Sequence, residues 1–208
     1  MSSDIIQTFK GLLINPTDTL QKLRDEPLGD AFIYFLTITP ILVVLLAIVS
    51  ALELGSMSTV SAIPISAIFW IGYLIAYILC MYVGCIIGMF ISSAILHIFV
   101  YFLGGRNGFD QTAKAVIYSY TPAVLLGWIP ILGLIGGIWS LVLEILAVRE
   151  LHEISTGRAV LAVILAILSY IVALIMVVVM IILMFGFFMI LISQPSTLPI
   201  DQAFLPTM

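Results

Sequence analysis

His97 and Glu144 are the residues whose types and surroundings best suit them to chemistry, because both lie within long apolar segments. Glu144 stands about 7 Å of helix before Arg149, and His97 stands about 13 Å before Arg106, so their depths in a membrane would be similar. Ionisable residues at such depths are costly and are candidates for function. We predict a His97–Glu144 pair that relays protons or holds an ion. The alternatives are a structural hydrogen bond, or a glutamate that extends to the nearby surface.

Other catalytic or metal-binding patterns are missing from the sequence. The chain has two histidines and two cysteines, and the spacing of Cys80 and Cys85 puts them on different faces of a helix. This is neither a metal-binding nor a redox spacing. The sequence has no Gly-x-Ser-x-Gly elbow and no phosphate-binding loop. We therefore expect no enzyme, no cofactor and no metal.

The composition around these residues is that of a membrane protein. The chain is 63% hydrophobic and 9% charged, and the segment from Leu54 to Gly105 holds no charged residue. As a helix this segment would measure roughly 78 Å, too long for one crossing of a bilayer core of about 30 Å. The net charge of -4 and the lack of a basic stripe argue against a nucleic-acid partner. The sequence predicts an all-α integral membrane protein whose main partner is the lipid bilayer.

The order of the elements predicts five transmembrane helices preceded by short amphipathic interfacial helices. Residues 1–30 would form the cytoplasmic amphipathic helices, 31–192 the transmembrane domain, and 193–208 an irregular tail outside. The first helix has an apolar face at helical spacing, as in helices that lie on a membrane. Its members are Ile5, Ile6, Phe9, Leu12 and Leu13. Pro40 should kink the first span, 31–52, and free a backbone carbonyl.

The uncharged segment leaves two interpretations. Two crossings would put Arg106 and Lys114 on the side opposite the basic residues of the N-terminal region, whereas one crossing keeps all of them together. The positive-inside rule favours one crossing. We predict an interfacial stretch or a helix extension near 61–75, and the second span at 76–103. A helical hairpin over 115–148, fully crossing or re-entrant, and a last span over 159–192 complete the set. All seven basic residues are then cytoplasmic, with the N-terminus inside and the C-terminus outside.

Small residues form two stripes at helical spacing. Gly84, Gly88 and Ser92 follow one another on the second span, and Gly133 and Gly137 open the fourth. Such stripes let helix backbones approach closely in lipid. We predict packing within one protomer, and the alternative is a face for a homo-oligomer or another membrane protein.

Four short motifs resemble those of the Yip family of Ypt/Rab-interacting membrane proteins. They are the stretch from Leu103-Gly104-Gly105-Arg106 to Lys114, Tyr118-Ser119-Tyr120-Thr121-Pro122, Ile129-Pro130-Ile131-Leu132-Gly133 and the stretch from His152 to Ala159. The resemblance covers nearly the whole chain. It implies a five-span α-helical fold and, for eukaryotic members, roles in ER–Golgi traffic through small GTPases and homologous partners.

Two departures from the family pattern bear on the partner. The sequence has neither a long soluble N-terminal region nor the acidic Asp-Leu-Tyr-Gly-Pro element, and Tyr118 and Tyr120 do not form a Gly-Tyr-x-x-Pro arrangement with Pro122. These departures argue against binding of a small GTPase. They favour a prokaryotic cell-membrane member over an ER or Golgi one. The tyrosines suit anchoring at the headgroup level or packing, with a partner site as the alternative.

The function predicted from these features is that of a non-enzymatic adaptor for membrane organisation or trafficking. It would act through membrane or protein partners. The alternative is a small transporter or channel-like protein that uses Glu144 and His97.

Overall fold

The computed structural model describes residues 2–56 and 67–193, and every regular element in these ranges is a helix. The prediction of an all-α membrane protein is confirmed. Four helices are long and apolar enough to cross a membrane. The elements are α1 (Ser2–Ile14), α2 (Pro16–Leu23), α3 (Leu28–Ser56), α5 (Ala67–Phe102), α6 (Phe109–Ser119), α7 (Thr121–Leu126), α8 (Pro130–His152) and α9 (Thr156–Ser193). The chain divides into two units, Met1–Ala166 and Ile167–Met208.

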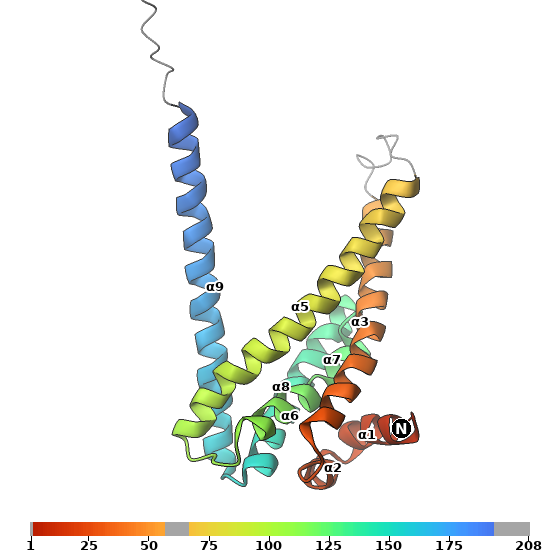
Figure 1. Ribbon diagram of the computed structural model, residues 1–208, viewed down its shortest axis with the longest axis vertical. Coiled ribbons are helices and arrows are strands. Elements are labelled where there is room, and N and C mark those ends of the chain that lie inside the picture. The colour runs from red at the N-terminus through yellow and green to blue at the C-terminus, as the bar shows by residue number, and fades with distance from the viewer. Residues whose placement is uncertain (1, 57–66, 194–208) are drawn as a thin grey trace, which may run out of the picture. The chain divides into compact units, whose positions relative to one another are not determined.

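The helices α3 and α5 form an antiparallel hairpin (Figure 1). Pro40 lies inside α3 and has no N–H, so the carbonyl of Leu36 loses its helical partner, as predicted. The hydroxyl of Tyr82 on α5 donates to this carbonyl at 3.2 Å. A lipid-facing backbone carbonyl without a partner would be costly, and the neighbouring helix supplies the missing donor.

The helix α5 begins earlier than the predicted second span. It is continuous from Ala67 to Phe102, so the helix-extension interpretation holds from Ala67 to Ile75. The remainder of the predicted 61–75 stretch, residues 61–66, lies outside the described residues. The physical reason is composition, because residues 67–75 contain no charge, proline or glycine pair that would end a helix.

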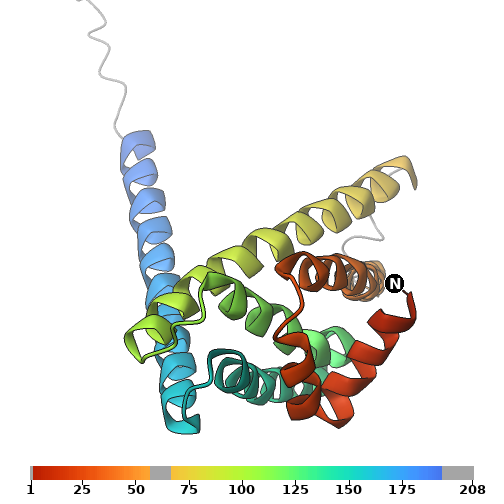
Figure 2. The same cartoon turned by 60° about the horizontal axis from the view of Figure 1, so that its bottom comes forward.

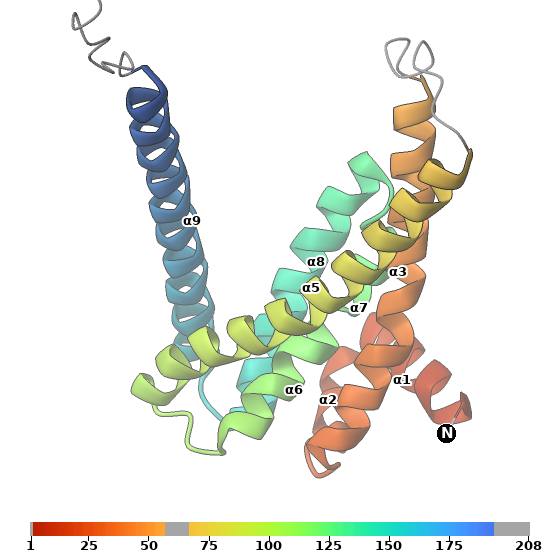
Figure 3. The ribbon, with the colours of Figure 1, turned by 45° about the horizontal axis from the view of Figure 1, so that its top comes forward.

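The predicted third span is divided into α6 and α7, of 11 and 6 residues. The break falls at Tyr120, and Pro122 lies in the first turn of α7, where a proline is tolerated. The hydroxyl of Thr121 donates to the carbonyl of Tyr118 at 2.8 Å, in place of the N–H that Pro122 lacks. These two helices pack against α8 and complete a helical hairpin (Figure 3).

The N-terminal helices pack on this hairpin (Figure 2). Contacts join α1 to α2 and α7, and α2 to α8. Leu12, Leu20 and Leu23 are buried, whereas Ile14 is 82% exposed. Pro16 in the first turn of α2 separates the two helices, since a proline cannot continue the preceding one. The apolar face of the first helix is therefore used partly for packing within the protein.

The second unit consists of the later part of α9. From Ile171 to Ile192 every residue is apolar or glycine, so this part of the helix has no polar face. A helix that is hydrophobic all round belongs in a membrane or a large core. This run is long enough to cross a bilayer once.

Candidate functional site

The polar side chains of the first unit gather where α2, α6 and α8 meet. We call this cluster the polar layer. Its members are Gln21, Arg24, His97, Asn107, Gln111, Thr112, Lys114, Glu150, His152 and Glu153. Its members come from α2, α6 and α8 and the turns that follow α2 and α8, from the α5–α6 loop, and, with His97, from α5.

Thr112 connects both histidines of the chain. Its hydroxyl oxygen lies 2.8 Å from Nδ1 of His97 and 2.9 Å from Nε2 of His152. Thr112 and His152 are buried, and the His97 ring stands edge-on to Phe109 at 5.6 Å. Because a hydroxyl has one proton, it donates to one ring and accepts an N–H from the other. The result is a directional hydrogen-bond chain across α5, α6 and α8.

The surroundings of His152 determine the direction of this series of hydrogen bonds. Its Nδ1 is buried and has no hydrogen-bond partner in the part of the chain that the structure describes. The backbone of Gly105 closes over the ring, since an added Cβ there would meet Nδ1 at 3.0 Å. A bare lone pair at this position is cheaper to bury than an unpaired N–H. We therefore assign the proton to Nε2 of His152, which donates to Thr112, which in turn donates to His97.

Lys114 closes the C-terminal end of α2. Its ammonium donates to the backbone carbonyls of Leu23, Arg24 and Glu26, at 3.3, 2.6 and 2.8 Å. The last carbonyls of a helix have no partner within the helix, and they carry its negative end. Burial lowers the pKa of Lys114, and the carboxylates of Asp110, Glu26 and Asp25 act in the opposite direction. A side chain of α6 thus holds the turn between α2 and α3.

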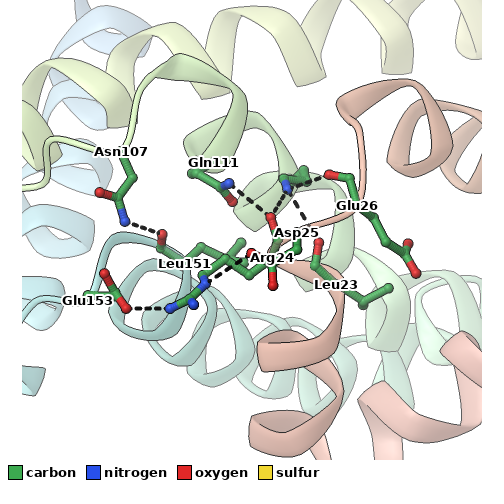
Figure 4. Close-up of polar contacts among 9 residues, drawn as sticks. Leu23, Arg24, Asp25, Glu26, Asn107, Gln111, Leu151 and Glu153 are labelled. Atoms are coloured by element: carbon green, nitrogen blue, oxygen red, sulfur yellow. Dashed lines mark hydrogen bonds and ion pairs between the residues drawn. The ribbon is translucent and has the colours of Figure 1, made fainter.

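Further polar contacts join α2 to the end of α8 (Figure 4). Arg24 pairs with Glu153, and Gln21 donates to Glu150 at 2.9 Å. Asn107, in the loop after α5, donates to the carbonyl of Leu151 at 2.9 Å. The ion pair is partly exposed to solvent and is worth roughly 1 kcal/mol or less. These contacts fix geometry more than they add stability.

The predicted His97–Glu144 pair has no hydrogen bond or ion pair within the described residues. His97 is bonded to Thr112, and Glu144 lies partly buried on α8, two helical turns before His152. The pair stays a prediction. Sequence reasoning missed Thr112 as the neighbour of His97 and His152 as the next member of this hydrogen-bond chain. Thr112 belongs to no recognisable motif, and His152 stands in a charged stretch between the predicted hairpin and the predicted last span.

The tyrosine motif packs inside the protein. Tyr118 lies against Tyr34 with ring centroids 5.6 Å apart, and Tyr120 lies against Phe35 at 5.8 Å. The hydroxyl of Tyr34 bonds Thr121 at 2.8 Å. These contacts tie the α6–α7 break to α3, and they favour packing as the role of the motif.

The predicted small-residue stripes differ in what they touch. An added Cβ at Gly84, Gly88 or Gly137 would meet nothing within 4 Å, whereas one at Gly133 would meet the carbonyl of Gly127 at 3.2 Å. A closer approach than that at Gly133 occurs at Gly136, which was not predicted. An added Cβ there would lie 2.9 Å from Cβ of Leu126 and 3.0 Å from the carbonyl of Pro122. Gly136 is therefore the residue that lets α8 approach α7.

The polar layer offers hydrogen bonding and proton exchange, and its donors do not suit a metal. Among the described residues, no group of three or more His, Cys, Asp or Glu side chains could hold an ion.

Comparison with known proteins gives one match. Neither the curated proteins nor the solved structures provide a match to this chain. The family model of the Yip1 domain matches residues 10–180, which run from α1 into α9. The match covers all the elements of the polar layer and the whole helical hairpin. The chain therefore belongs to the Yip1 domain family.

Proposed function

We propose that this Yip1-domain protein is a non-enzymatic, membrane-organising adaptor that holds membrane or protein partners in a groove between α2 and the end of α8. The groove measures about 470 Å³ and is lined by charges of both signs, from Arg24, Arg149, Glu150 and Glu153. One observation carries the proposal. The hydrogen bonds of the polar layer tie both walls together, and ordered walls lower the entropy cost of binding. The proposal includes no small GTPase.

Charge reversal in the groove tests this function. Glu153→Lys changes the charge of the groove and breaks only a solvent-exposed ion pair, so the fold should persist. Cross-linking and affinity capture from native membranes should then lose proteins that the wild type captures. Lys22→Glu is the matched control, because Lys22 is exposed and does not line the groove. Equal capture by both variants would refute an adaptor role for this groove.

The second candidate is a small transporter or channel-like protein that uses Glu144 and His97. The chain of hydrogen bonds from His97 through Thr112 to His152 favours it, since such chains can pass protons. Flux of protons in proteoliposomes would decide the matter. Flux that depends on pH and disappears in Glu144→Gln would replace the adaptor function with transport.

We also propose that α5 forms a homo-oligomer contact through Gly84, Gly88 and Ser92. The open space above both glycines supports this, because a second helix could approach closely there. Gly84→Leu with Gly88→Leu should reduce cross-linked dimer in membranes. Gly72→Leu on the same helix, where the space is also open, is the control. Unchanged dimer in the double variant would remove the proposal.

The proposed location is a prokaryotic cell membrane, with an ER or Golgi membrane as the alternative. Residues 1–30 would face the cytoplasm, 31–192 would form the membrane domain, and 193–208 would lie outside. The gathering of Arg24, Lys114 and Arg149 around the polar layer supports this orientation, because basic residues are enriched on the cytoplasmic side.

A further inference from the structure

We propose that the end of α5 and the first turn of α9 form a binding site for the phosphate of an anionic phospholipid. The guanidinium groups of Arg106 and Arg158 would hold the phosphate, and exposed apolar side chains beside them would contact the acyl chains. This inference does not depend on the adaptor function, because neither arginine lines the α2–α8 groove.

Both guanidinium groups lie on the end of α5, although the two arginines come from different parts of the chain. The guanidinium carbon of Arg106 lies 4.2 Å from the centre of the Tyr101 ring. Nη1 of Arg158, from the first turn of α9, lies beside Gly104, where an added Cβ would meet it at 3.1 Å. Because Tyr101 and Gly104 are about one helical turn apart, two cationic groups gather at this end of α5.

The turn that ends α5 makes room for Arg158. Gly104 has a φ of 98°, in the left-handed region that favours glycine. Its N–H donates to the carbonyl of Tyr101 at 3.2 Å, and the N–H of Gly105 donates to the carbonyl of Val100 at 2.9 Å. This pair of hydrogen bonds is a common way to end a helix with glycine. Since Gly104 has no side chain, the guanidinium group can lie against it.

The protein does not neutralise either arginine. Within residues 2–56 and 67–193, no hydrogen bond or ion pair joins the side chain of Arg106 or Arg158 to another residue. Glu153, the last acid before Arg158 in the sequence, pairs with Arg24 instead. A guanidinium group presents parallel N–H donors that match the oxygens of a phosphate. The charge and the donors of this site are therefore complementary to a phosphate.

The first turn of α9 adds backbone donors to the site. The N–H of Ala159 is bonded to the carbonyl of Ser155 at 3.1 Å, and the N–H groups before it have no acceptor within the helix. An added Cβ at Gly157 would meet nothing within 4 Å, so the start of the helix is open to a ligand. The positive end of the helix favours an anion there.

Apolar surface next to the arginines favours a lipid over a free phosphate. The apolar part of α5 ends at Phe102, and that of α9 begins at Thr156, so the site lies at the ends of two candidate membrane spans. The ring of Phe102 is 79% exposed and stands edge-on to Tyr101 at 6.3 Å. Leu161 on α9 is exposed as well. Cationic donors at the membrane surface beside apolar side chains match the order of groups in a phospholipid.

Native mass spectrometry of the purified full chain tests the proposal. The protein is presented with equal amounts of dioleoyl phosphatidylglycerol and dioleoyl phosphatidylcholine in mixed micelles. The wild type should retain phosphatidylglycerol in about tenfold excess, a ratio within reach of two arginines near a membrane surface. The net charge of the chain is -4, so its overall charge would not produce this preference. Equal retention of the two lipids would overturn the proposal.

Paired variants locate the site. Arg106→Gln with Arg158→Gln should bring the ratio of the two lipids to about one. Lys10→Gln with Lys22→Gln removes the same charge from two exposed positions and should keep the excess. An excess that survives the arginine double variant would refute the site. An equal loss in both double variants would show attraction by charge alone and would overturn it as well.

Thermal unfolding in detergent gives a second measurement on the same variants. Both arginine side chains are exposed, so the arginine double variant should unfold at the wild-type midpoint when no lipid is added. Phosphatidylglycerol should raise the midpoint of the wild type, because a ligand of the folded state stabilises it. The rise should be smaller in the arginine double variant, and equal rises would contradict the site.

Soluble glycerophosphoglycerol, the headgroup without acyl chains, separates a lipid from a free phosphate. At a concentration equal to that of the lipid, it should leave the retained phosphatidylglycerol unchanged, because it lacks the apolar contacts. Displacement of the lipid at that concentration would show a free-phosphate site and would overturn the lipid as the occupant.

Discussion

Thr112 carries the most specific prediction at the scale of single residues. Thr112→Val keeps the shape of the side chain but removes the hydroxyl that joins His97 and His152. A buried ring N–H then loses its acceptor, and the free energy of unfolding should fall by about 1–3 kcal/mol. Thr112→Ser keeps the hydroxyl and should lose much less. Thermal unfolding of the two variants in detergent measures the difference, and equal midpoints would show that the chain of hydrogen bonds adds no stability.

Lys114 should contribute more to the stability of the protein than its position on a short helix suggests. Lys114→Met removes a charged donor from three carbonyls that follow or end α2. The carbonyls of Leu23 and Arg24 keep donors from the Glu26 backbone and the Gln111 side chain. Because a hydrogen bond to a charged group is worth about 1.5–3 kcal/mol, the free energy of unfolding should fall by about that amount. Lys22→Met removes the same charge from an exposed position of α2 and should have little effect. A Lys114 variant as stable as this control would contradict the capping role.

At the scale of elements, the approach of α8 to α7 depends on Gly136. Gly136→Ala would place its Cβ within 3.0 Å of the Pro122 carbonyl and of Leu126, and the two helices would have to separate. We expect a loss of about 1–3 kcal/mol from such overpacking. Gly137→Ala meets open space and should stabilise the helix by about 0.5–1 kcal/mol. Opposite shifts in the unfolding midpoint support the packing, and equal shifts contradict it.

The sequence predicted those elements whose boundaries are set by local chemistry. The apolar runs of α3, α8 and α9 define helices on their own, and Pro40 was correctly expected to free a carbonyl. The break between α6 and α7 was not predicted. Pro122 allows either a kink or a new helix, and contacts of Thr121 with Tyr34 and with the Tyr118 carbonyl accompany the second outcome. The contact with Tyr34 comes from α3, 87 residues away in the sequence, and leaves no local signal.

In the candidate site, the sequence gives the position of a residue along its helix but not the direction in which its side chain points. The helical rise gives the distance of a residue such as His97 from the end of its helix, but it does not state which neighbouring helix the side chain faces. His97 faces Thr112 on α6, and Glu144 lies on another helix. Spacing likewise selected Gly133 and Gly137 as a stripe, although Gly136 between them lies closer to α7. Such choices depend on the rotation of each helix about its axis, which tertiary packing decides.

At the scale of the whole molecule, orientation follows from where the basic residues gather. The chain has seven Lys and Arg; Arg24 and Lys114 belong to the polar layer, and Arg149 lines the adjoining groove. We expect that one membrane crossing by α5 and a returning hairpin of α6, α7 and α8 keep Arg106, Arg149 and Arg158 on one side. From the positive-inside rule we expect this side to face the cytoplasm and, with a final crossing by α9, the C-terminus to lie outside.

Cysteine labelling in intact cells tests this orientation. Cys80 and Cys85 are first replaced by alanine, and single cysteines are then introduced as Asp110→Cys, Gly157→Cys or Glu53→Cys. Asp110 is exposed and Gly157 faces open space, so both positions tolerate the change. A membrane-impermeant maleimide should label the Glu53→Cys variant from outside and the other two only after permeabilisation, because the charge of Glu53 marks the far end of α3. Labelling of either loop variant in intact cells would reverse the orientation, and with it the side on which the polar layer and the α2–α8 groove meet their partners.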